Sequence, residues 1–128
     1  VTGDESMTNK ELVLKFYEEV FNGWDTSHLD LYMREDYKQH NPHVEDGREG
    51  FRRFSEKFLA LRPHMDIHHI LADGDLVCVF FKCTLGTNGM VNKVFDMYRI
   101  EDGKLAEHWD CVEHDLGDIT PVHANGLF

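Results

Sequence analysis

Four polar residues with clear potential for chemistry lie on two consecutive predicted strands near the C-terminal end of the chain. Asp96 and Tyr98 belong to the first strand, and His108 and Asp110 belong to the second. Side chains alternate between the faces of a strand, so each pair points to one side of the sheet. If the strands form a hairpin, Asp96 faces Asp110 and Tyr98 faces His108. Facing carboxylates repel one another, which indicates either a shared proton in a dry pocket or an ordinary solvated face.

The predicted register depends on the turn Glu101-Asp-Gly-Lys104 between these strands. A glycine in a tight turn favours a left-handed backbone, and a bulge commonly follows such a residue. We therefore expect Gly103 to be left-handed and Glu101 to face Leu105 across the turn. This arrangement gives the Asp96 to Asp110 pairing.

His40 and Asn41 end a short predicted strand just before Pro42. From this rim position either side chain could bind a ligand or could simply cap a turn. Large apolar side chains at core spacings could line a cavity or form ordinary core; they are Trp24, Met33, Tyr37, Phe51, Phe54, Phe58 and Phe80. We expect the substrate contacts to be Tyr98, Asn41, Trp24, Phe51 and Phe58.

The HxD spacing of His108-Trp-Asp110 also occurs in iron sites with two histidines and one carboxylate. His40, His43 or His123 could supply the third ligand. The oxygenases that use such sites are generally larger double-sheet barrels, so we predict neither a metal nor a cofactor. His68 and His69 point to opposite faces of their strand, and we expect surface positions for them.

The rest of the pattern predicts an α+β fold in which helices precede a sheet. Thr8 and Glu11 form a capping box that opens an amphipathic helix ending at Asn22-Gly23. A short helix over 27–33, a brief strand over 37–40 and a third helix, capped by Asp46 and ended by Arg62-Pro63, follow. From Met65 onward, turn residues separate four antiparallel strands, at 65–72, 76–85, 90–100 and 105–114. Residues 1–7 read as a disordered tail or remnant and 8–128 as one domain.

Strand 76–85 is apolar on both faces, so both faces need a cover. Three helices can cover one face, and a second copy of the chain is the simplest cover for the other. Phe95, Met97, Trp109 and Cys111 share this outer face by parity. We therefore expect a homodimer.

The composition excludes several partners. Asp and Glu number 24 against 13 Lys and Arg, a net charge of −11, which would repel nucleic acids and anionic membranes. No apolar run is long enough for a membrane span, and no signal peptide is evident, so a cytoplasmic location is expected. Cys78, Cys83 and Cys111 lie in apolar stretches without metal-binding spacing and read as buried free thiols.

Two stretches, Gln39-His-Asn-Pro42 and especially Glu101-Asp-Gly-Lys-Leu-Ala-Glu-His-Trp-Asp110, resemble the SnoaL-like polyketide cyclase group of the nuclear-transport-factor-2-like superfamily. The resemblance runs from Thr8 to His114. It implies a cone-shaped α+β barrel, three N-terminal helices packed on a strongly curved, mostly antiparallel sheet around a cavity. It also implies that Asp110 matches the acid/base aspartate of the cyclases. Asp96 departs from the group, which carries a histidine there.

These observations predict cofactor-independent proton transfer at a carbon acid, by aldol-type cyclisation or isomerisation of a small organic substrate. Asp110 would be the base, and His108, a protonated Asp96 or His40 would donate to the enolate oxygen. Two alternatives stay open: a cavity hydrolase that opens epoxides, and a non-enzymatic small-molecule-binding or dimerisation module.

Overall fold

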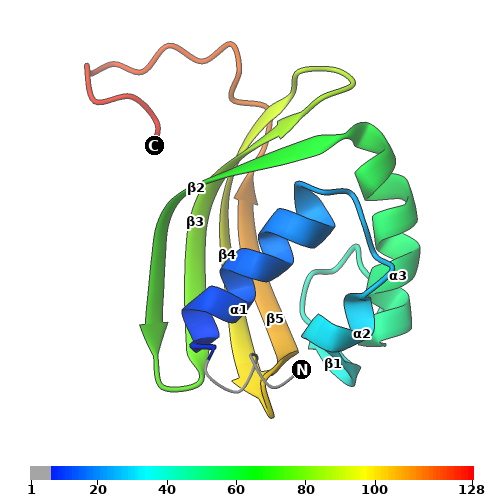
Figure 1. Ribbon diagram of the computed structural model, residues 1–128. Coiled ribbons are helices and arrows are strands. Elements are labelled where there is room, and N and C mark those ends of the chain that lie inside the picture. The colour runs from blue at the N-terminus through cyan, green and yellow to red at the C-terminus, as the bar shows by residue number, and fades with distance from the viewer. Residues whose placement is uncertain (1–6) are drawn as a thin grey trace.

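The computed structural model describes residues 7–128, in which three helices lie on one face of a five-stranded sheet (Figure 1). The strand order is β1-β5-β4-β3-β2, with β1 parallel to β5 and every other pair antiparallel. The predicted α+β class and helix-on-sheet architecture are confirmed. No helix of the described part is long and apolar enough to cross a membrane. The elements are α1 (Asn9–Phe16), η2 (Tyr17–Phe21), α2 (Leu29–Tyr32), β1 (Met33–Gln39), α3 (Gly47–Phe58), η3 (Leu59–Leu61), β2 (Pro63–Asp73), β3 (Leu76–Leu85), β4 (Val91–Glu101) and β5 (Lys104–Glu113).

The N-terminal helix begins as the sequence predicts and ends in an unexpected way. Thr8 Oγ1 accepts from the amide of Glu11 at 3.1 Å, and Glu11 Oε1 accepts from the amide of Thr8 at 3.0 Å. After Phe16 the helix widens into the π-helical turn η2. The amide of Asn22 closes this turn on the carbonyl of Tyr17 at 2.9 Å. The turn keeps Tyr17 buried against the sheet.

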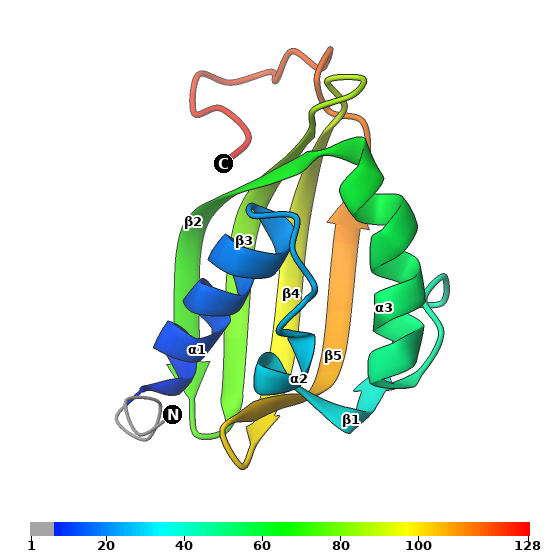
Figure 2. The same ribbon diagram turned by 45° about the vertical axis from the view of Figure 1, so that its right-hand side comes forward.

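The start of α3 corrects one capping assignment. Asp46 is the N-cap residue by position, but its side chain makes no bond to the helix. Asp46 Oδ1 instead accepts from the amide of Gln39 at 2.8 Å. This bond ties the loop that contains Asn41 to the end of β1, beside the sheet face that the helices cover (Figure 2).

The last hairpin has the predicted pairing at the site and a different turn. Asp96 pairs with Asp110 and Tyr98 with His108, but the register shifts between Arg99 and Ile100. Asp102 and Gly103 both have positive φ, at 52° and 72°, which makes a two-residue turn of the hairpin type. The expected facing of Glu101 and Leu105 is therefore wrong, because the extra residue of the bulge lies within β5 rather than at the turn.

The two faces of strand β3 differ in burial: one lies under the helices, and the other is the outer face of the sheet. Its odd-numbered residues from Val77 to Leu85 are buried, whereas the even-numbered ones are only partly buried. On the outer face Phe80 stacks on Phe95 at 4.5 Å, and Phe95 is 50% exposed. All three cysteines are free, but only Cys83 is buried; the expectation of burial is wrong for Cys78, which is partly exposed, and for Cys111, which is exposed, because both lie on the outer face.

Gly50 allows the loop before α3 to pack closely against the helix. A Cβ at this position would lie 2.2 Å from the carbonyl oxygen of Glu45. Alanine is better than glycine in a helix by about 1 kcal/mol, but this overlap outweighs that gain. We expect Gly50→Ala to lower the free energy of unfolding by about 1–3 kcal/mol in a urea titration. Glu56→Ala, on the exposed side of α3, is the control, and equal stability of both variants would contradict this account.

Candidate functional site

A cavity of about 290 Å³ lies between the sheet and α3. Its walls are largely aromatic and apolar, and a polar cluster from β4 and β5 occupies one side. Such apolar pockets with a few convergent polar groups are typical of small-molecule sites. The lining includes Phe21, Tyr37, Gln39, Asn41, Phe51, Phe54, Phe58, Met65, Phe81, Asn92, Val94, Asp96, Tyr98, His108, Asp110 and Val112.

The imidazole of His108 lies between the two carboxylates that face one another across the hairpin. Its Nε2 is 3.0 Å from Asp96 Oδ1 and 3.8 Å from Asp110 Oδ2. His108 is 7% exposed and Asp96 is 6% exposed, so water screens this contact poorly. A positive imidazolium between the carboxylates offsets their mutual repulsion without a proton shared between them.

Gln39 determines which nitrogen of His108 carries a proton. Gln39 Oε1 accepts from the backbone amides of His40 and Asn41, each at 3.0 Å, so this atom is the amide oxygen. The same oxygen is 2.7 Å from His108 Nδ1. An oxygen can only accept, so Nδ1 carries a proton. A second proton on Nε2 makes the ring a cation that donates to Asp96.

Two buried tyrosines hold the other oxygen of Asp96. The hydroxyl of Tyr17 donates to Asp96 Oδ2, and the hydroxyl of Tyr98 lies 3.3 Å from Oδ2 and 2.9 Å from the Tyr17 hydroxyl. Burial, and after it the charge of Asp96, raises the pKa of both tyrosines well above the usual value. Both therefore remain protonated donors. Asp96 thus lines the cavity with both of its oxygens bonded, Oδ1 to His108 and Oδ2 to these tyrosines.

Asp110 has a different environment from Asp96. Asn41 Nδ2 donates to Asp110 Oδ2 at 2.8 Å. No group among residues 7–128 donates to Asp110 Oδ1. The side chain is 15% exposed and lines the cavity. Asp110 is thus the carboxylate that keeps an oxygen available to a ligand.

Several other predicted site residues also line the cavity. Tyr98, Asn41, Phe51 and Phe58 do so, as do Tyr37 and Phe54 from the wider aromatic set. Tyr37 stacks on His108 with ring centroids 6.3 Å apart.

His40 is on the wrong side of the sheet to donate to a ligand. Gln39 and Asn41 line the cavity, so His40 between them points to the other face. There it stacks on Trp109 at 5.0 Å and binds Glu107 at 2.8 Å. The expected catalytic role of His40 is therefore not supported by its position.

Trp24, Met33 and Phe80 also lie outside the cavity lining. Trp24 is 44% exposed, donates to the carbonyl of Pro63 and packs under Arg62. Met33 is core, and Phe80 lies on the outer face. The structure therefore does not bring Trp24, whose backbone is left-handed at φ 54°, to the cavity with the other expected substrate contacts.

Three residues of the site were not singled out from the sequence. Tyr17 is four residues after Val13 on the apolar stripe of the first helix. Gln39 shares its face with Asn41, and Asn92 shares the parity of Asp96 on the same strand. These periodicities could have located them.

Two groups of residues within the described part of the chain have ligand atoms close enough for a metal ion. Asp96, His108 and Asp110 form one, but a metal there would have to displace the proton that joins His108 to Asp96. Glu19, Asp25 and His28 form the other, at the surface, where Tyr32 already donates to Glu19. The absence of a metal stays a prediction.

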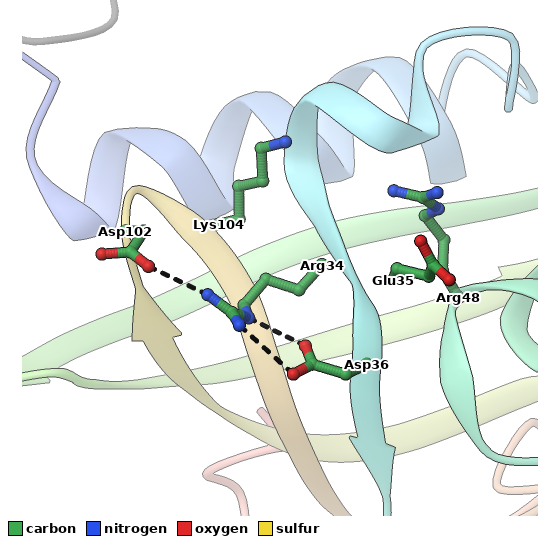
Figure 3. Close-up of a pocket in the computed structure, with 6 residues that line it drawn as sticks. All are labelled: Arg34, Glu35, Asp36, Arg48, Asp102 and Lys104. Carbon is green, nitrogen blue, oxygen red and sulfur yellow. Dashed lines mark hydrogen bonds and ion pairs between the residues drawn. The ribbon is translucent and has the colours of Figure 1, made fainter.

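A second hollow, of about 610 Å³, lies at the β1 end of the molecule (Figure 3). Its charges largely neutralise one another. Arg34 is 2.8 Å from Asp36 and 2.9 Å from Asp102, so its guanidinium is already paired. With no comparable apolar wall, this hollow does not compete as the functional site. Its lining is Arg34, Glu35, Asp36, Arg48, Asp102 and Lys104.

The sequence matches the SnoaL-like domain over residues 13–108, most of the chain. The chain belongs to the SnoaL-like family. No curated protein matches it. The family and its cavity support a small-molecule role.

Solved structures with the same fold include three bacterial proteins. A proposed polyketide cyclase from Acidithiobacillus ferrooxidans is 22% identical with a TM-score of 0.74, over 84% of this chain and 89% of that one. IdmH, a proposed polyketide cyclase from Streptomyces antibioticus, is 21% identical with a TM-score of 0.69, over 84% and 93%. AclR, a proposed hydroxylase from Streptomyces galilaeus, is 21% identical with a TM-score of 0.70, over 82% and 88%. At these identities the likeness shows the fold.

The cation at His108 predicts how stability depends on pH. Burial alone would lower the pKa of His108, but the charge and hydrogen bond of Asp96, with the charge of Asp110, raise it. Because the pKa of His108 is higher in the folded than in the unfolded protein, protonated His108 stabilises the fold. This contribution is complete below the unfolded pKa of about 6.5 and is lost as the pH rises through the folded pKa. The free energy of unfolding should therefore fall above about pH 6.5, by at most about 1.4 kcal/mol per pH unit.

Urea titrations between about pH 6 and pH 9 measure this dependence. His108→Gln should abolish the decline, whereas His64→Gln, at an exposed position, should keep it. An identical decline in His108→Gln would show that another group is responsible.

Proposed function

We propose that this protein catalyses proton transfer at a carbon acid within its cavity, with Asp110 as the general base. The observation that carries the proposal is that the two facing carboxylates differ in how many of their oxygens are already bonded. Asp96 is saturated by Tyr17, Tyr98 and His108, whereas Asp110 keeps Oδ1 available to a ligand. A base needs a free lone pair directed at the proton it removes.

The chemistry begins when Asp110 Oδ1 removes a proton from the carbon next to a substrate carbonyl. The electron pair of the C–H bond forms the enolate, and negative charge develops on the carbonyl oxygen. The protonated Asp110 then returns the proton to another carbon in an isomerisation, or to the alkoxide that an aldol closure forms. No cofactor enters this balance.

His108 supports this reaction through its charge rather than through a free hydrogen bond. Both of its N–H groups are directed at protein acceptors, Gln39 and Asp96. A fixed positive charge 3.8 Å from Asp110 stabilises negative charge that moves from this carboxylate to the substrate oxygen. The apolar walls exclude water and strengthen the effect.

Asn41 fixes the direction in which Asp110 points. Its amide holds Oδ2 and leaves Oδ1 without a protein donor among the described residues. The loop that contains Asn41 is itself held by the bond from Gln39 to Asp46. A base held in this way keeps its orientation between turnovers.

Replacement of Asp110 by Asn tests the base directly. The change keeps the shape but removes the ability to take a proton. A suitable reaction is exchange of the acidic protons of 2-tetralone in D2O, followed by mass spectrometry. We expect Asp110→Asn to lower the catalysed rate by about 10² to 10⁴, the contribution of general-base catalysis, with little change in ligand affinity.

Asp118→Asn, an exposed change outside the cavity, is the control and should exchange at the wild-type rate. Full exchange by Asp110→Asn would end the mechanism. Saturable binding of 2-tetralone without any catalysed exchange by the wild-type protein would favour the binding module instead.

We also propose that two copies associate through the outer face, here the residues Cys78, Phe80, Phe95, Met97, Trp109 and Cys111. Phe95 is 50% exposed at its centre, and Leu71 on β2 is 68% exposed. Contiguous apolar surface of this kind is typical of interfaces. A second copy related by a twofold axis would cover it with the same residues.

Sedimentation of Phe95→Glu tests this association. We expect the wild-type protein to be dimeric at micromolar concentration and Phe95→Glu to shift toward monomer, because burial of an unpaired charge opposes the contact. Leu14→Glu, which places the same charge on an exposed position of α1, should remain dimeric. A monomeric wild-type protein would refute the proposal.

A further inference from the structure

Asn92 is a buried polar residue that the acid/base cluster does not use. It is 9% exposed and lines the cavity on β4. On the side of β3 its neighbours are apolar: Asn92 pairs with Cys83, which pairs with Met65 on the next strand. A polar side chain in such a place needs partners for both ends of its amide.

Only one end of the Asn92 amide has a protein partner. The backbone N–H of Asp115 donates to Asn92 Oδ1 at 2.9 Å, which identifies the oxygen and leaves Nδ2 as the other end. Among residues 7–128, no group accepts a hydrogen bond from Nδ2. Nδ2 is not among the fully buried unpaired atoms of the described residues, so it keeps surface that a ligand can reach from the cavity. An acceptor from outside the chain can therefore bond to Nδ2 there, in a largely apolar environment.

The position of Asn92 relative to the acid/base cluster defines what this acceptor can be. Asn92 and Asp96 point to the same face of β4, four residues apart, which is roughly 13 Å along the strand. Val94 and Val112, paired with one another, form the apolar floor between them. One oxygen atom cannot reach both Asn92 and Asp110.

We propose that Asn92 is a substrate-binding residue whose Nδ2 donates to a second oxygen of the substrate. The ligand class is then an elongated, largely apolar ring compound with an oxygen at each end. Its reactive end lies beside Asp110, its ring lies over Val94 and Val112, and its far carbonyl or ether oxygen meets Asn92. This assignment rests on the proposed function only in taking the same cavity as the substrate site.

A matched pair of probes isolates the second oxygen. 6-Acetyl-2-naphthol carries a hydroxyl at one end and a carbonyl at the other, and 6-ethyl-2-naphthol has nearly the same shape without the carbonyl. Dissociation constants are measured by calorimetry, and the side-chain amide resonance of Asn92 is followed by NMR. We expect the wild-type protein to bind the acetyl probe about tenfold more tightly, with the Asn92 amide signal shifted by that probe alone.

Asn92→Asp is the informative variant because it keeps the acceptor for Asp115 and removes the donor. Asn92→Ala removes both, and thermal unfolding verifies that each variant is folded. The preference for the acetyl probe should vanish in both variants. Asn88→Asp is the control, because Asn88 also accepts from a backbone amide, that of Met90, but lies outside the cavity; it should keep the preference.

An unchanged preference in Asn92→Asp and Asn92→Ala would overturn the assignment. So would a wild-type protein that binds neither probe at millimolar concentration. These binding ratios need no turnover, so their failure leaves the exchange test of Asp110 intact. Conversely, Asp110→Asn could exchange protons at the full rate while Asn92→Asp loses the preference for the acetyl probe. That result would refute the role of Asp110 as base and would support the role of Asn92 in binding.

Discussion

The structure of the site depends on a buried imidazole held between two facing carboxylates. Without His108, the Asp96 to Asp110 pairing would place two like charges side by side in an apolar environment. With a proton on each nitrogen, the ring of His108 offsets the negative charges of both carboxylates. It also links β5 to β4 on the cavity side of the sheet. The cost of burying these charges is offset by hydrogen bonds at almost every polar atom, and the one carboxylate oxygen left over is the one available for chemistry.

Three segments outside the last hairpin each supply one partner to this cluster. The π-helical turn brings Tyr17 to Asp96, the end of β1 brings Gln39 to His108, and the loop before α3 brings Asn41 to Asp110. Removal of any partner would leave a buried polar atom unsatisfied. The π turn therefore lies where the cluster requires the side chain of Tyr17 to reach inward.

The sequence predicts the parts of this site that depend on local periodicity. The capping box, the order of elements and the pairing of Asp96 with Asp110 follow from spacing and turn residues, and the structure has them. His40 shows the limit of prediction from local spacing. Two adjacent residues at the end of a strand point to opposite faces. The one that faces the cavity is decided by how β1 pairs with β5, about seventy residues later. The bulge within β5, where the pairing with β1 also shifts, depends on the same long-range packing. Local spacing contains no information about these choices.

The parallel pairing of β1 with β5 also has a consequence for how the protein folds. Strands β2 to β5 follow one another through short turns and form by local closure, whereas β1 must return across most of the chain to pair beside β5. Contacts between distant segments form late because closing a long loop costs entropy. We therefore expect Asp96, His108 and Asp110 to meet early, in the meander of β2 to β5, and Gln39 and Asn41 to join them later with β1. In a partly folded chain the three charged side chains are together, but the residues that orient them are not yet in place. Ligand recognition therefore requires the completed fold.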